Sequence, residues 1–193
     1  MKKRSAQKER SLRTKRVAVC GMMIALGVII LYMGSLIEVL DISMAAIASL
    51  LCIIAVIEYG KAYAWMVYGG TALVAMLLLP EKFTPSLYAL IIGYYPILKE
   101  LIERIGKRSI FKKRLFVALR WAIKLVFFNV ALLAFALVAI YLLALPETEE
   151  WLQITMFVLC NVTFVIYDVA LTGLISTYIF RIRVRLRLPG SGR

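Results

Sequence analysis

The chain has 193 residues, of which 63% are hydrophobic, and a formal net charge of +13. Soluble domains are closer to half apolar, so this composition excludes an ordinary water-soluble fold and predicts that much of the surface faces lipid. In a soluble protein such a charge would suggest a nucleic-acid partner. Here the basic residues form blocks between apolar runs, which favours a role in membrane topology and no nucleic-acid partner.

Six apolar runs predict six transmembrane helices, each near the length of about 20 residues that crosses a bilayer. The first run follows a basic segment but is too long for a signal peptide, so we expect it to stay uncleaved. We predict a basic tail at 1–16, spans at 17–37, 42–57, 62–79, 86–105, 115–145 and 151–180, and a basic tail at 181–193. The expected fold class is an all-α, polytopic six-helix bundle.

Turn residues separate these runs. Asp41 or Ser43 is the expected N-cap of the second helix. Gly60 lies in a predicted tight turn between the second and third helices. Pro96 follows Gly93 and two tyrosines, which predicts a kink inside the fourth span.

The charge of the connecting segments alternates along the chain. The tails and the segment 99–114 are strongly basic, whereas the loops around 38–41, 80–85 and 146–150 are mainly acidic. Cytoplasmic loops carry an excess of lysine and arginine. Six crossings therefore predict a multi-pass cell-membrane protein with both termini and every basic block in the cytoplasm.

Polar residues inside a span are costly in lipid and are functional candidates by default. Asp168 lies near the middle of the last span, with Asn161 seven residues before it and Thr172 four after it. At 3.6 residues per turn these three share one helix face. Two roles stay open for Asp168, a hydrogen bond that packs helices and a contact to a ligand.

The fifth predicted span adds Asn129 and Lys124. We expect Asn129 near the depth of Asp168, where the two would hydrogen-bond or share a ligand. Lys124 lies about 7 Å closer to the cytoplasm at 1.5 Å per residue. Its ammonium group is expected to snorkel to the inner headgroups, with an ion pair to Asp168 as the alternative.

Tyr88, Tyr94 and Tyr95 flank the predicted kink in the fourth span. Buried tyrosines line pockets, but they also fill cores. In the first outer loop, Glu38 and Asp41 are candidates to bind a cation, although a cap on the second helix is the expected role of Asp41. The outer acids as a set favour a cationic substrate or follow topology alone.

Small residues recur on the first predicted helix at Ala18, Gly21 and Ala25. This spacing lets another helix approach closely. The stripe therefore predicts either internal packing or a docking face for a partner protein.

Several enzyme classes are excluded by what the chain lacks. It has no histidine, and its three cysteines lie inside apolar runs without metal-site spacing. Tyr167-Asp168 resembles half of an intramembrane aspartyl protease site, but the other aspartate, Asp41, lies in an outer loop. Glu149-Glu150 begins a CAAX-protease-like motif that then has Ile154 at its arginine position. With no Walker motif either, we expect no enzyme and no cofactor.

Six helices, cytoplasmic termini, a short chain and the small-residue stripe resemble the S components of energy-coupling factor (ECF) transporters. In that family an alanine-x-x-x-alanine-like motif on the first helix contacts the transmembrane coupling subunit. The matching positions here are Gly21 and Ala25, with glycine in place of the first alanine. The resemblance implies a substrate pocket near the outer side, lined by Glu38, Tyr88, Tyr95, Asn129, Asn161 and Asp168.

The function implied by this resemblance is non-catalytic binding of a vitamin-like or other small solute. Import would be driven by partner ATPase subunits through a coupling subunit, with the lipid bilayer as surroundings. The alternative is a structural membrane protein of a cell-envelope complex, similar in size and helix count to the rod-shape protein MreD. A transport role predicts a sealed polar pocket, whereas a scaffold predicts a dry interior with Asp168 paired internally.

Overall fold

The computed structural model describes residues 2–106, 113–141 and 149–178, and most of the described residues are helical, with no strand among them. The chain divides into two compact units, residues 1–97 and 98–193. Within the described ranges, five helices are long and apolar enough to cross a membrane. This result confirms the all-helical class and supports a membrane protein with several spans.

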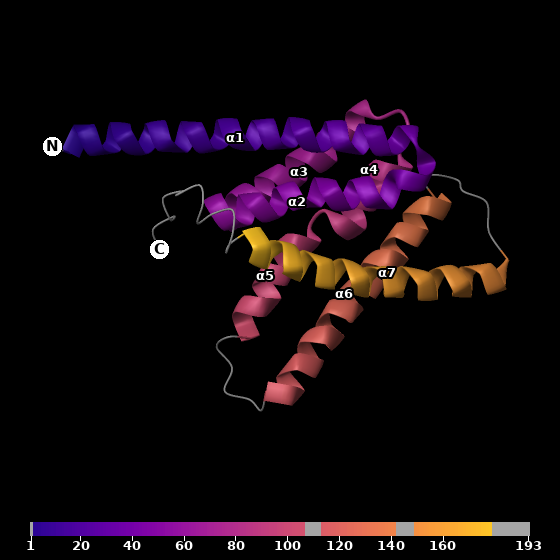
Figure 1. Cartoon of the computed structure of the whole chain (residues 1–193). Helices are drawn as coiled ribbons and strands as arrows, with labels where there is room; N and C mark the ends of the chain where they lie inside the picture. Colours follow the sequence, from indigo (N-terminus) through magenta and orange to yellow (C-terminus); the bar gives the residue numbers. More distant parts are fainter. Residues whose placement is uncertain (1, 107–112, 142–148, 179–193) are drawn as a thin grey trace. The chain divides into compact units, whose positions relative to one another are not determined.

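Unit 1 is built around three long helices, α1 (Lys2–Leu36), α2 (Asp41–Tyr59) and α3 (Lys61–Leu78). Each of them packs against the other two (Figure 1). The single-turn η1 (Glu38–Leu40) joins α1 to α2. Gly60 joins α2 to α3 at φ +90°, a left-handed conformation that glycine adopts without steric cost. The predicted tight turn is therefore confirmed.

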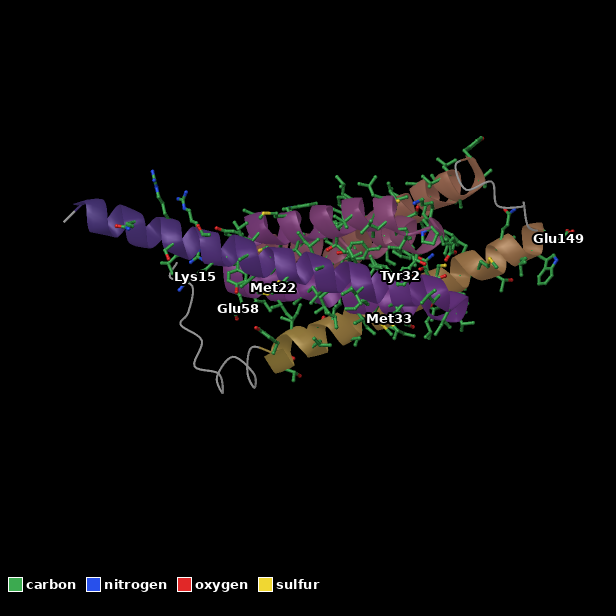
Figure 2. All side chains as sticks on the ribbon, turned by 90° about the horizontal axis from the view of Figure 1, so that it is seen from above. Lys15, Met22, Tyr32, Met33, Glu58 and Glu149 are labelled. Carbon is green, nitrogen blue, oxygen red and sulfur yellow. The ribbon has the colours of Figure 1, made fainter. Side chains whose placement is uncertain are left out.

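The basic tail is part of α1 and not a separate segment. The helix has 35 residues, which corresponds to about 52 Å at 1.5 Å per residue. Its apolar span covers Arg10–Leu36, so the helix extends beyond its span at the N-terminal end. Figure 2 shows Lys15 toward that end, and Met22, Tyr32 and Met33 further along the same helix. These last three side chains are exposed, as expected of residues that face lipid.

Small residues let the helices of unit 1 approach closely. Its core includes a cluster of buried residues on four helices: Cys20, Cys52, Ala55, Ala64, Val67 and Ile97. Gly27 and Gly70 add to this packing, because a Cβ atom at either position would lie 2.9 Å from Thr71 or 2.5 Å from Ile24, respectively. Glycine at these two positions therefore allows α1 and α3 to pack as closely as they do.

The predicted fourth span, 86–105, is not one continuous helix. The chain forms α4 (Phe83–Leu87), the π-helix η2 (Tyr88–Ile92) and, after a break at Gly93 and Tyr94, α5 (Tyr95–Gly106). The predicted kink before Pro96 is confirmed, but this segment is not among the five candidate spans. The longest helix of the segment, α5, has 12 residues and is too short to cross a membrane by itself.

The expected cap of the second helix is also wrong. Leu40 occupies the N-cap position of α2, without a side-chain hydrogen bond, and Asp41 is the first residue of the helix. The buried Asp41 carboxylate instead accepts a hydrogen bond from the Thr84 hydroxyl of α4. Asp41 thus bonds to a residue far along the chain instead of capping its own helix, and no local sequence pattern predicts that partner.

Unit 2 holds the rest of α5, α6 (Lys113–Tyr141) and α7 (Glu150–Thr177). The last two contain the candidate spans Ala118–Tyr141 and Trp151–Thr177. Both helices expose large apolar side chains along much of their length: Val126, Val130, Leu133, Leu159, Ile166 and Val169. The C-terminal basic tail and the predicted ends of the last two spans lie outside the described residues.

Candidate functional site

The candidate site is a cluster of charged side chains inside unit 2. Asp168 on α7 lies at its centre, with Lys99 of α5 and Lys124 of α6 on the same carboxylate. The three side chains are 3%, 1% and 8% exposed, respectively. Asp168 and Lys124 both lie within candidate membrane spans. A charged group in such surroundings is tolerated only when it is paired.

Lys99 is held by three acceptors. Its Nζ atom donates to Oδ1 of Asp168 at 2.6 Å, to the backbone oxygen of Asp168 at 2.6 Å and to Oγ1 of Thr172 at 2.7 Å. An ammonium group has three N–H donors, so this set uses all of them. Asp168 and Thr172 therefore act together from one face of α7, as their spacing predicts.

Lys124 is bound differently. Its Nζ atom lies 3.0 Å from Oδ1 and 2.9 Å from Oδ2 of Asp168, and 3.6 Å from Oε1 of Glu103. The same ammonium lies 5.5 Å from the centre of the Trp121 ring, within the range of a cation–π contact. The expectation that Lys124 snorkels to the headgroups is wrong, because the Asp168 carboxylate holds it in the interior.

The polar cluster lies at a contact between α6 and α7. Phe128 of α6 stacks on Phe164 of α7 with ring centroids 4.2 Å apart. Phe128 lies four residues after Lys124, and Phe164 lies four residues before Asp168. The two helices therefore run in opposite senses through this contact, and the spacing of about 3.6 residues per turn puts each pair on the facing sides.

A second polar pair lies beyond the aromatic stack. Asn129 and Asn161 exchange hydrogen bonds, with Nδ2 to Oδ1 distances of 3.1 and 3.2 Å. Each amide nitrogen also donates to the carbonyl four residues earlier in its own helix, Leu125 or Phe157. The sequence predicts that Asn129 either hydrogen-bonds to Asp168 or shares a ligand with it. The register of α6 and α7 instead places Asn161 opposite Asn129.

The other predicted site residues belong to unit 1. Tyr88 is fully buried, with its hydroxyl 3.4 Å from the Cys52 sulfur, and Tyr95 is also buried. A Cβ atom at Gly93 would lie 2.8 Å from the Tyr88 ring, so glycine makes room for this tyrosine. Tyr88 therefore fills the core of unit 1. The side chain of Glu38 lies outside the described part of the structure.

The stripe on α1 takes no part in the close packing of unit 1. Ala18, Gly21 and Ala25 are exposed, and a Cβ atom at Gly21 would meet nothing within 4 Å. Internal packing uses other small residues of the same helix, as Gly27 shows. Of the two roles that the stripe predicts, internal packing is thus excluded at Gly21 within unit 1.

Lys99 is the site residue that sequence reasoning missed. It was counted with the basic segment 99–114, yet it is among the most buried side chains described. A signal was present: Lys99 lies one helical turn before Ile102 on the buried face of α5, and Asp168 required a cation inside the membrane. Among the described residues, no cluster of three metal-ligating side chains forms.

Comparison with protein-family models, curated proteins and solved structures finds no match to this chain. The class that fold and site define is therefore a helical protein with several candidate membrane spans and a buried Lys–Asp–Lys cluster.

Proposed function

We propose that this protein is the solute-binding membrane subunit of an importer that partner ATPase subunits drive, as in the ECF transporters that its layout resembles. The observation that carries the proposal is the buried cluster of Lys99, Lys124 and Asp168. Ionisable side chains inside membrane spans are characteristic of solute and ion pathways.

The neighbouring contacts of α6 and α7 argue that this cluster has a role besides packing. Next to it the same helix pair is joined by two phenylalanines and then by two neutral asparagines. These side chains pack the helices without burying charge. Replacing a buried charged set by apolar residues is often neutral or stabilising, so three charges at one layer favour a function that needs them.

In this proposal the broken segment α4–η2–α5 is the sixth crossing, in addition to the five candidate spans. With five crossings alone, the basic tails at 1–16 and 181–193 would lie on opposite sides of the membrane, against the positive-inside rule. The segment from Phe83 to Gly106 has 24 residues, more than the roughly 20 that a helical crossing needs. Discontinuous helices of this kind occur in transporters where irregular backbone lies inside the protein.

The exposed stripe on α1 is the proposed docking face for the coupling subunit. Ala18, Gly21 and Ala25 offer a shallow surface on which another helix can approach closely. Gly21→Leu fills that surface and is expected to release the coupling subunit. The matched control is Met22→Leu on the same helix turn, which keeps the volume of an exposed side chain and should retain the partner.

Affinity purification from native membranes, followed by mass spectrometry of proteins and small molecules, tests the proposal. We expect an ATPase pair and a membrane coupling subunit to co-purify, together with a small solute. Recovery of cell-envelope proteins without ATPase subunits or solute would replace the importer by the scaffold.

The scaffold is the second candidate, favoured by the internal pairing of the polar residues. Both carboxylate oxygens of Asp168 are engaged by lysines, and Asn129 and Asn161 satisfy each other. This closed arrangement is the one expected of a packing role. An MreD-like protein would then use the cluster to fix the α5–α6–α7 arrangement and would bind no solute.

A further inference from the structure

The charges of the three buried side chains, Lys99, Lys124 and Asp168, do not balance. Lys99 and Lys124 bring two positive charges to the single carboxylate of Asp168. An uncompensated charge in a medium of low dielectric constant is costly. The second negative charge comes from Glu103, whose Oε1 atom lies 3.6 Å from Lys124 Nζ, so the cluster needs one anion besides Asp168.

The geometry identifies Lys124 as the lysine that receives this anion. Lys99 already donates to three acceptors at 2.6–2.7 Å. Lys124 has the Asp168 carboxylate on one side and Glu103 on another, at 3.6 Å. Charge-assisted N–H···O bonds are about 2.7–2.9 Å long, so Glu103 lies in range of an ion pair but beyond a good hydrogen bond.

Glu103 also lies at the accessible side of the cluster. Its side chain is 38% exposed, whereas that of Lys124 is 8% exposed. The Trp121 ring lies beside the same ammonium, 5.5 Å from it. Lys124 is thus bordered by a partly exposed carboxylate and by an aromatic surface.

We propose that Lys124 binds the carboxylate of a small, partly apolar organic acid in place of Glu103, with the acid's apolar body against Trp121. This inference rests on the proposed function, because it names the class of solute. Glu103 belongs to the basic segment 99–114 that is expected in the cytoplasm, so the proposed site is the one from which the solute leaves on the inner side. Exchange of one carboxylate for another keeps the charge balance of the cluster and adds a shorter hydrogen bond. A neutral or cationic solute would leave Lys124 uncompensated once Glu103 moved.

The test measures binding of benzoate to the purified full-length chain in nanodiscs by isothermal titration calorimetry. Benzamide and benzylamine serve as neutral and cationic probes of the same shape. Glu103→Gln removes the competing carboxylate, so we expect it to bind benzoate at least tenfold more tightly than the unaltered protein. Neither other probe should gain affinity in this variant.

Two further variants locate the site. Added to Glu103→Gln, Trp121→Leu should weaken benzoate binding by removing the aromatic surface, and Lys124→Arg should retain binding because the charge stays. Equal benzoate affinity with and without Glu103, or an equal gain for benzamide, would overturn the inference. Preferred binding of benzylamine would overturn it in favour of a cationic solute.

The inference and the proposed function can fail separately. Co-purification of ATPase subunits with a neutral or cationic solute would contradict the carboxylate site and leave the importer standing. Benzoate binding that depends on Glu103 in a protein that co-purifies with no ATPase subunit would contradict the importer and retain the site.

Discussion

At the scale of single residues, Asp168 has the largest predicted effect on stability. Removing its charge leaves two buried lysines without a counter-ion. Breaking a buried ion pair in this way costs about 3–5 kcal/mol. We therefore expect Asp168→Asn to unfold at a much lower denaturant fraction, measured by tryptophan fluorescence during titration with sodium dodecyl sulfate.

A triple variant separates charge from packing in that experiment. Lys99→Met, Lys124→Met and Asp168→Leu together remove every charge of the cluster and keep most of its volume. This protein is expected to regain most of the lost stability. If Asp168→Asn alone unfolded like the unaltered protein, the three side chains would not form a buried ion pair.

The asparagine pair has a smaller and separable effect. Asn129 and Asn161 bond to each other, so their contributions should not be additive. A double-mutant cycle with Asn129→Leu and Asn161→Leu should give a coupling free energy of about 0.6 kcal/mol, with about 1.7 kcal/mol as an upper value for such pairs. A coupling of zero in the same unfolding assay would mean that the two amides do not meet.

At the scale of elements, glycines of α1 distinguish internal packing from a free surface. Gly27→Val would place atoms against Thr71 of α3, whereas Gly21→Val meets nothing within 4 Å. Overpacking costs about 1–3 kcal/mol. We expect lower thermal stability for Gly27→Val alone, measured by a thiol-reactive dye assay or by aggregation temperature. Equal loss in both variants would contradict the α1–α3 packing.

The register of α6 and α7 is a second prediction about elements. Phe128 and Phe164 stack, so cysteines at these positions in a background without the natural cysteines should cross-link. The control pair, Phe128→Cys with Val162→Cys, places the second thiol on an exposed face and should stay unlinked. Linkage of the control pair instead would imply another register, which gel mobility after mild oxidation reports.

At the scale of the whole molecule, the side of each terminus decides how often the chain crosses the membrane. Cysteines at Ser5 and Ser191 can be labelled in intact cells by a reagent that does not cross membranes. We expect neither to react until the membrane is opened, because we propose that the broken segment from Phe83 to Gly106 adds a crossing to the five candidate spans. Labelling of one terminus alone would show an odd number of crossings.

The five candidate spans could be predicted from the sequence, because the hydropathy of an apolar run depends only on its own residues. The turn at Gly60 and the break before Pro96 could also be predicted, because glycine and proline act on the backbone at their own positions. The burial of Lys99 on α5 could not be predicted, because only its partners on α7 explain it.

The candidate site was predicted in part. Position in the last apolar run identified Asp168 as a buried charge that needs a partner, and helical spacing placed Thr172 on its face. The ion pair of Lys124 with Asp168 was one of two predicted roles, and the structure decided between them. The part played by Lys99 and the pairing of Asn129 with Asn161 came only from the tertiary structure. Sequence alone thus determined which segments are apolar helices and which polar groups are costly there. Only the structure decided how those groups pair, because pairing depends on the register between helices far apart in the chain.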